Sequence, residues 1–179
     1  MTPVKDERGF SLTESLIALG VLSTGMLAIA AGFLQGTMQL TGSELDIVAR
    51  EKAAEAVESV FTARDTRTVQ WVEIRNADPD EGTGGGVFLD GPQPLRRPGS
   101  DGLVNTADDP EELESITRPG PDGMLGTEDD VVEALGQFTR EVIIRDVNTT
   151  LRELQVVISY NVGGVVRRYE IRTLISSYA

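Results

Sequence analysis

Three kinds of hydrophobic pattern follow one another along this chain. From Ser15 to Ser43 no side chain is charged, and Glu14 is the only ionisable group at the start of this apolar stretch. As a helix, Ser15–Leu34 would span ~30 Å, about the thickness of the hydrocarbon core of a bilayer. The pattern therefore predicts a transmembrane helix over residues 10–36.

An amphipathic pattern replaces the uniform apolar one after this stretch. Apolar residues recur at steps of three and four, while charged residues occupy the positions between them. The apolar positions are Leu45, Val48, Ala49, Ala53, Ala56, Val57, Val60 and Phe61. We expect an amphipathic helix over residues 37–66, with an apolar stripe that needs a partner.

The C-terminal part of the chain is rich in β-branched residues that alternate with polar ones. Residues 137–147, 151–162 and 165–178 follow this pattern, and Asn161-Val162-Gly163-Gly164 separates the last two segments as a hairpin turn would. We expect an antiparallel sheet within residues 137–179, covering the apolar stripe of the helix. The predicted fold class is α+β.

Residues 67–136 show poor periodicity and many Gly, Pro and Asp residues, which predicts loops. Thr68–Ile74 fits a short strand or a last helical turn, with Trp71 as an anchor in the core. Between Asn76 and Leu135 there are fifteen acidic residues and three arginines, so this segment carries nearly all of the net charge of −13. Such a surface repels phosphate, and we expect no direct nucleic-acid binding.

The composition speaks against an enzyme. The chain has no cysteine and no histidine, which removes thiolate nucleophiles, the usual general base and the commonest metal ligands. No glycine fingerprint for nucleotides follows a predicted strand. We expect no catalytic activity.

A repeat stands out within the acidic segment. Asp101–Asp109 (DGLVNTADD) and Asp122–Asp130 (DGMLGTEDD) are offset by 21 residues, and each follows a turn that contains Pro-Gly. Calcium takes six to eight oxygen ligands at flexible angles, and short Asp-rich loops bent at glycine supply them. The candidate calcium ligands are Asp101, Asp108, Asp109, Asp122, Asp129 and Asp130.

A second interpretation of the repeat needs no metal. The two segments would be solvated Asp-Gly turns whose final Asp pairs cap short helices beginning after Asp109 and Asp130, because aspartate is favoured at helix N-termini. One carboxylate can cap with one oxygen and bind calcium with the other. Both interpretations stay open on the sequence alone.

The N-terminal segment Gly9-Phe10-Ser11-Leu12-Thr13-Glu14 lies between a short charged leader and the long apolar stretch. It resembles the processing signature of type IV prepilins and pseudopilins. The resemblance implies that a prepilin peptidase cuts after Gly9 and methylates the amine of Phe10. It also implies that Glu14 meets the N-terminal amine of a neighbouring subunit during assembly.

The resemblance implies a pilin-like fold and a place in a filament. The C-terminal strands separated by a Gly-Gly turn are most similar to PilV-like minor pilins, so we expect a minor pilin of a type IV pilus. A minor pseudopilin of a type II secretion system and a filament-displayed adhesin or uptake module are the alternatives. The expected partners are other pilin or pseudopilin subunits, the prepilin peptidase and the bacterial inner membrane.

Orientation and final location follow from the same reasoning. Lys5 and Arg8 precede the apolar stretch, and the next basic residue, Arg50, lies well beyond it, which favours a single pass with the N-terminus in the cytoplasm. The resemblance then implies a periplasmic or cell-surface filament. Calcium sites also occur in some pseudopilins, which adds to the calcium hypothesis by analogy.

Overall fold

The computed structural model describes residues 11–77 and 85–178 of this protein. The longest element is a helix, α1, at Leu12–Thr66. Contacts divide the chain into two compact units, Met1–Gly42 and Ser43–Ala179, and α1 contributes to both. Gly9, Phe10 and the leader before them lie outside the described residues.

The first unit consists of the apolar part of α1. Every described residue from Ser11 to Leu40 is exposed. Among the described residues, α1 is the one helix long and apolar enough to cross a membrane. The predicted apolar helix is thus present.

The second unit is built around the later turns of α1. The buried apolar residues of α1 lie on one face at the predicted spacing: Leu45, Val48, Ala49, Ala53, Ala56, Val60 and Ala63. Val57 and Phe61, also predicted for this stripe, are partly buried against the same core. Since the central positions are alanines, the helix can lie close to the elements that cover it.

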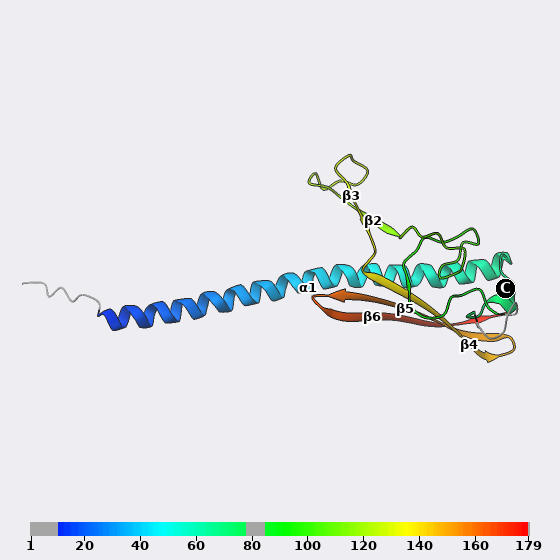
Figure 1. Ribbon diagram of the computed structural model, residues 1–179, viewed down its shortest axis with the longest axis horizontal. Helices are drawn as coiled ribbons and strands as arrows, with labels where there is room; N and C mark the ends of the chain where they lie inside the picture. Colours follow the sequence, from blue (N-terminus) through cyan, green and yellow to red (C-terminus); the bar gives the residue numbers. More distant parts are fainter. Residues whose placement is uncertain (1–10, 78–84, 179) are drawn as a thin grey trace, which may run out of the picture. The chain divides into compact units, whose positions relative to one another are not determined.

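A four-stranded antiparallel sheet covers this stripe (Figure 1). Its strands, in spatial order, are β1 (Gln93–Pro94), β4 (Phe138–Asn148), β5 (Leu151–Val162) and β6 (Val165–Ser176). The three long strands lie where the alternation predicts them, which confirms the α+β class. The short edge strand β1 was not predicted, because two residues cannot show a period.

The turn between β5 and β6 has the predicted geometry. Gly163 and Gly164 link Val162 to Val165 and have φ values of 58° and 86°. A two-residue turn with both φ angles positive matches the twist of the flanking strands, and glycine adopts it without a steric penalty. The Asn161 side chain stabilises the turn by accepting a hydrogen bond of 2.8 Å from the Gly164 amide.

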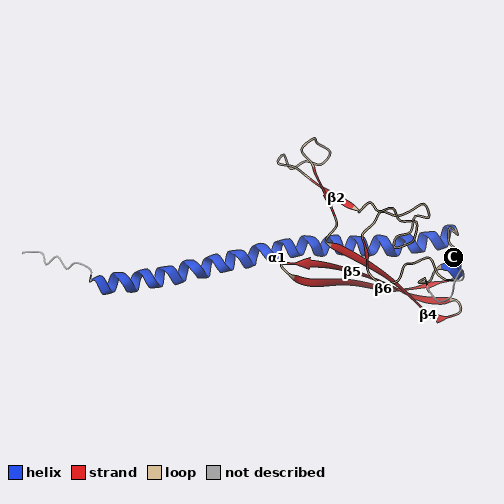
Figure 2. Cartoon of the chain, viewed as in Figure 1, coloured by secondary structure: helices blue, strands red, loops and turns tan. Residues whose placement is uncertain are grey.

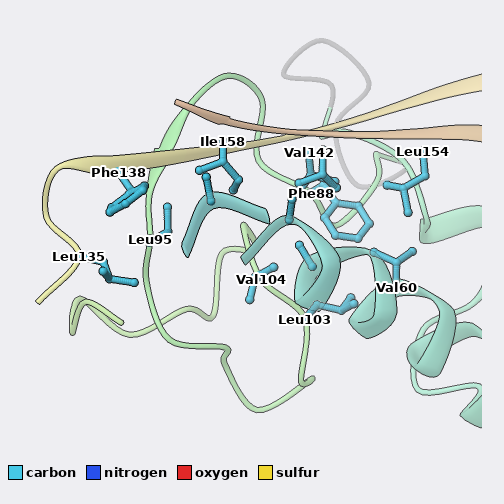
Figure 3. Close-up of a cluster of buried hydrophobic side chains, with 14 of the residues drawn as sticks. Val60, Phe88, Leu95, Leu103, Val104, Leu135, Phe138, Val142, Leu154 and Ile158 are labelled. Atoms are coloured by element: carbon cyan, nitrogen blue, oxygen red, sulfur yellow. The ribbon is translucent and has the colours of Figure 1, made fainter. Parts of the chain in front are cut away.

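The core lies between α1 and the sheet. Figure 3 shows Val60 of α1 with Phe88, Phe138, Val142, Leu154 and Ile158, all of which are buried. The rings of Phe138 and Tyr160 lie 5.3 Å apart between centroids. Leu103 and Val104 of the first Asp-rich segment join the same core.

The middle of the chain differs in part from the sequence prediction. Trp71–Glu73 forms a single turn of 3-10 helix, η1, close to the predicted helical turn, and Trp71 packs partly buried against the core as expected. β2 (Ser115–Arg118) and β3 (Val131–Ala134) form a separate two-stranded antiparallel sheet (Figure 2). The prediction of short helices after Asp109 and Asp130 is therefore wrong.

The physical reason lies in the residues that follow each Asp pair. Val131 and Val132 are β-branched and favour extended backbone, and Thr117 and Arg118 pair with them across the ladder. After the first Asp pair, the backbone pairs with a distant segment instead: Arg97 N donates to the Glu112 carbonyl at 3.1 Å, and Glu114 N donates to the Leu95 carbonyl at 2.8 Å. Acidic residues near a potential helix start could not outweigh the gain from strand pairing.

Candidate functional site

Glu14 is the one predicted assembly residue that the structure describes. It lies in the first turn of α1 and is exposed. A carboxylate near the N-terminus of a helix interacts favourably with the positive end of the helix dipole. Glu14 is also the single charged side chain of α1 before Glu44.

Three hydroxyl side chains within the apolar part of α1 donate hydrogen bonds to the helix's own backbone. Ser23 donates to the Leu19 carbonyl at 2.7 Å, and Thr24 donates to the Val21 carbonyl at 2.9 Å. Thr37 donates to the Leu34 carbonyl at 2.8 Å. Hydroxyl groups satisfied in this way cost little in an environment without water, which suits a helix surrounded by lipid or by other apolar helices.

The two Asp-rich segments form loops of the same conformation. Leu103 N donates to Asp101 Oδ1 at 2.8 Å, and Met124 N donates to Asp122 Oδ1 at the same distance. Gly102 and Gly123 both have positive φ, at 73° and 71°. We call Asp101–Asp109 the first loop and Asp122–Asp130 the second loop.

The last two aspartates of each loop hold its backbone together. In the first loop Asp109 Oδ2 accepts from the Asn105 amide at 2.7 Å, and Asp108 Oδ1 accepts from the Thr106 hydroxyl at 2.7 Å. In the second loop, the corresponding bonds to Asp130 and Asp129 are both 2.6 Å. Because equivalent aspartates accept equivalent bonds, the two loops are one structural unit used twice.

The pKa values of the aspartates follow from these bonds. The Thr106 hydroxyl lowers the pKa of Asp108, and the Thr127 hydroxyl lowers the pKa of Asp129, because both stabilise the ionised form. Burial raises the pKa of Asp101 and of Asp109, despite the backbone amides that they accept from. In the first loop, burial therefore outweighs hydrogen bonding at two of the three aspartates.

Glycines before each loop permit the close approach of the aspartates. A Cβ placed on Gly99 would lie 2.4 Å from Cγ of Asp108, and one on Gly120 would lie 2.5 Å from Cγ of Asp129. Both distances are shorter than van der Waals contact allows. The Pro-Gly turns noted in the sequence are thus part of the loop structure.

Most carboxylate oxygens in the loops point to amides and hydroxyls of the loop itself. Within residues 11–77 and 85–178, no three acidic side chains are grouped as a metal site would require. One oxygen differs from the others: Asp130 Oδ1 is buried and has no hydrogen-bond partner among the described residues. Its counterpart, Asp109 Oδ1, accepts from Gly99 N at 3.3 Å and from Thr106 Oγ1 at 3.1 Å.

Sequence analysis missed a buried ionic cluster beneath the first loop. Arg140 is 1% exposed and contacts Glu114 through Nη1 at 2.8 Å, while its Nε donates to Asn105 Oδ1 at 2.9 Å. Lys52 of α1 contacts the other oxygen of Glu114 at 3.1 Å. The available signal was the alternation of β4, which places Arg140 on the same face as Phe138 and Val142.

We compared the chain with protein-family models, with curated proteins and with solved structures, and none of them matches it.

Proposed function

We propose that this chain is a minor pilin-like subunit of a type IV pilus-like filament, processed after Gly9 and assembled through the apolar part of α1. The observation that supports this proposal is the continuity of α1. Its first turns are exposed and apolar with one carboxylate, and its later turns form the centre of a separate folded unit. A subunit that is anchored first in a membrane and then in a filament needs both parts.

The apolar part of α1 requires a partner that is not water. The exposed side chains include Leu16, Ile17, Val21, Leu27, Ile29 and Phe33, each more than half exposed. A continuous apolar surface of this kind marks contact with lipid or with other protein. In the proposed function, the inner membrane covers it before assembly and the helices of other subunits cover it afterwards.

Glu14 has a role in this proposal that explains its position. A lone carboxylate within a bilayer costs on the order of 2.5–3.5 kcal/mol on insertion scales. Cleavage after Gly9 would create a cationic amine on Phe10, about one helical turn from Glu14. Pairing of Glu14 with the amine of a neighbouring subunit offsets the cost and sets the register between the two helices.

Intact mass spectrometry tests the proposal. Protein recovered from membranes or filaments should begin at Phe10 and carry one added methyl group, and Gly9→Val should accumulate the uncut precursor. Gly20→Val is the matched control, since a side chain at Gly20 meets nothing within 4 Å and cleavage should proceed normally. Recovery of the chain with Met1 from assembled filaments would contradict the proposal.

A further inference from the structure

The two Asp-rich loops share a conformation but differ in what surrounds their apolar pair. In the first loop, Leu103 is 1% exposed and Val104 is 7% exposed, and Figure 3 shows both among the core side chains. The equivalent residues of the second loop, Met124 and Leu125, are 63% and 65% exposed. In the first loop the apolar pair is packed in the core, whereas in the second loop the equivalent pair is exposed.

The second loop lies at the end of an anchored arm. β2 and β3 pair along their full length, from Ser115 opposite Ala134 to Arg118 opposite Val131, and Figure 1 shows this hairpin projecting from α1. Arg118 fixes its base by contacting Glu44 of α1 at 3.0 Å and Glu133 of β3 at 2.8 Å. The exposed apolar pair therefore lies at the tip of a hydrogen-bonded hairpin whose base is fixed by ion pairs.

The charge around this pair restricts its partner. Asp122, Glu128, Asp129 and Asp130 surround it in sequence, and no basic residue lies between Arg118 and Arg140. Anionic lipid surfaces would repel such a loop. The partner that fits has exposed apolar residues beside arginines.

The edge strand β6 offers this combination. Val165 and Val166 at its start are 64% and 63% exposed. Val166 and Arg168 lie on the same face of the strand, since side chains alternate along it. Arg168 forms no ion pair with any described residue, whereas Arg167 on the other face contacts Asp46 of α1 at 3.5 Å.

The geometry requires two molecules for this contact. Figure 1 shows the β2–β3 hairpin and the β5–β6 turn on opposite sides of α1, so the second loop cannot reach β6 of its own chain. The two surfaces are also different, so each copy that donates a loop still has a free β6. An interface of this head-to-tail kind extends into an open polymer unless its rotation closes a ring.

We propose that the second loop of one copy docks Met124 and Leu125 against Val166 and Arg168 on β6 of a second copy. Apolar contact supplies the area, and the acidic residues of the loop face Arg168. This contact goes beyond the filament proposal, because it lies outside the apolar part of α1 and does not require cleavage after Gly9.

Disulfide cross-linking in the full chain tests the contact, since the chain has no cysteine of its own. Leu125→Cys combined with Val166→Cys, oxidised mildly in membranes, should form a ladder of dimers and larger multimers, because each copy carries both cysteines. The matched control replaces Val166→Cys with Val147→Cys. Val147 is 55% exposed and lies at the other end of the sheet, so this pair should form no ladder.

Charge reversal tests the polar half of the contact in the same double-cysteine chain. Glu128→Arg or Arg168→Glu alone should slow the initial cross-linking about two- to fivefold, as expected for exposed charge pairs. The two reversals together should restore the original rate. Equal ladders from the control pair, or no recovery in the doubly reversed chain, would overturn the inference.

A final comparison separates this inference from the filament proposal. The Gly9→Val precursor, held uncut in the membrane, should still form the ladder when it also carries Leu125→Cys and Val166→Cys. If the double-cysteine chain with Gly9 is processed normally but forms no ladder, the contact alone is overturned. Absence of processing with an intact ladder would contradict the filament proposal alone.

Discussion

Arg140 and Glu114 form an ion pair beneath the first loop, with 2.8 Å between Arg140 Nη1 and Glu114 Oε1. Arg140 also donates to the Arg96 carbonyl at 3.2 Å and to Asn105 Oδ1 at 2.9 Å. The Asn105 side chain in turn donates a hydrogen bond through Nδ2 to the Arg140 carbonyl at 2.7 Å. The cluster ties the first loop, the segment before β2 and the strand β4 to one another.

Removal of one partner from this cluster should destabilise the folded unit strongly. Glu114→Gln leaves the buried charge of Arg140 without its counter-ion, and such changes cost about 3–5 kcal/mol. The expected result is a lower midpoint of denaturant unfolding for the full chain in detergent. The matched control is Glu112→Gln, because Glu112 and its partner Arg97 are both exposed and such pairs contribute about 0–1 kcal/mol. Similar midpoints for the two variants would contradict the importance of the cluster.

Glu14→Val should separate membrane insertion from assembly. Insertion should stay intact or improve, because the change removes a charge from the apolar part of α1. Incorporation into sheared filaments should fall, because the partner for the Phe10 amine is lost. Gln35→Val is the control, since it also replaces a polar side chain of this helix, and its incorporation should be normal. Equal recovery of the Glu14→Val and parent subunits in filaments would show that the pairing role is wrong.

Calcium binding stays a prediction for the loops, and the second loop is where it should be strongest. Asp130 Oδ1 is buried and has no partner among the described residues, and a cation would satisfy it. A ligand that binds only the folded state stabilises it by about 2.7 kcal/mol at a hundredfold excess over its dissociation constant. We expect calcium to raise the thermal midpoint of the full chain in detergent, and magnesium to raise it less because of its stricter octahedral geometry.

Two variants locate the calcium effect. Asp130→Asn alone should remove most of the calcium-dependent rise, and Asp108→Ala combined with Asp129→Ala should abolish it. Each variant is compared with itself in chelator, so that a loss of stability without metal is not mistaken for a loss of binding. Equal melting in calcium and chelator, together with no heat of binding, would leave both loops as turns held by aspartate.

Tyr160 should titrate well above an ordinary tyrosine. Burial, together with a hydrogen bond to Asp46, raises the pKa of Tyr160 from 10.0 to about 12. Because the folded-state pKa is the higher one, the stability that Tyr160 contributes is present below pH 10 and is lost as the pH rises through about 12. Asp46→Asn should lower the pKa only in part, since burial remains.

Ultraviolet absorbance of tyrosinate measures this titration. Tyr160→Phe identifies the contribution of Tyr160 by difference. A contribution of Tyr160 centred at the ordinary tyrosine pKa of 10.0 would contradict the predicted shift.

Local periodicity was sufficient to predict the long elements of this protein. The three- and four-residue spacing from Leu45 to Phe61 predicted the buried face of α1, and alternation predicted β4, β5 and β6. These signals are strong because a buried face repeats over many residues. The apolar stretch after Glu14 also predicted its helix directly, because an uninterrupted run of apolar residues is visible in the local sequence alone.

Only the tertiary structure decided the roles of the two loops and of Arg140. The repeat indicated equal loops, and their aspartates accept equivalent bonds, yet Val104 is in the core while its counterpart Leu125 is exposed. No local property of such a short segment specifies whether a distant helix and strand will cover it. The alternation of β4 placed Arg140 on the face of Phe138 and Val142, but it did not reveal Glu114 and Asn105, its partners from other parts of the chain. Long-range pairing of this kind leaves no periodic trace in the sequence, because each partner contributes a single residue.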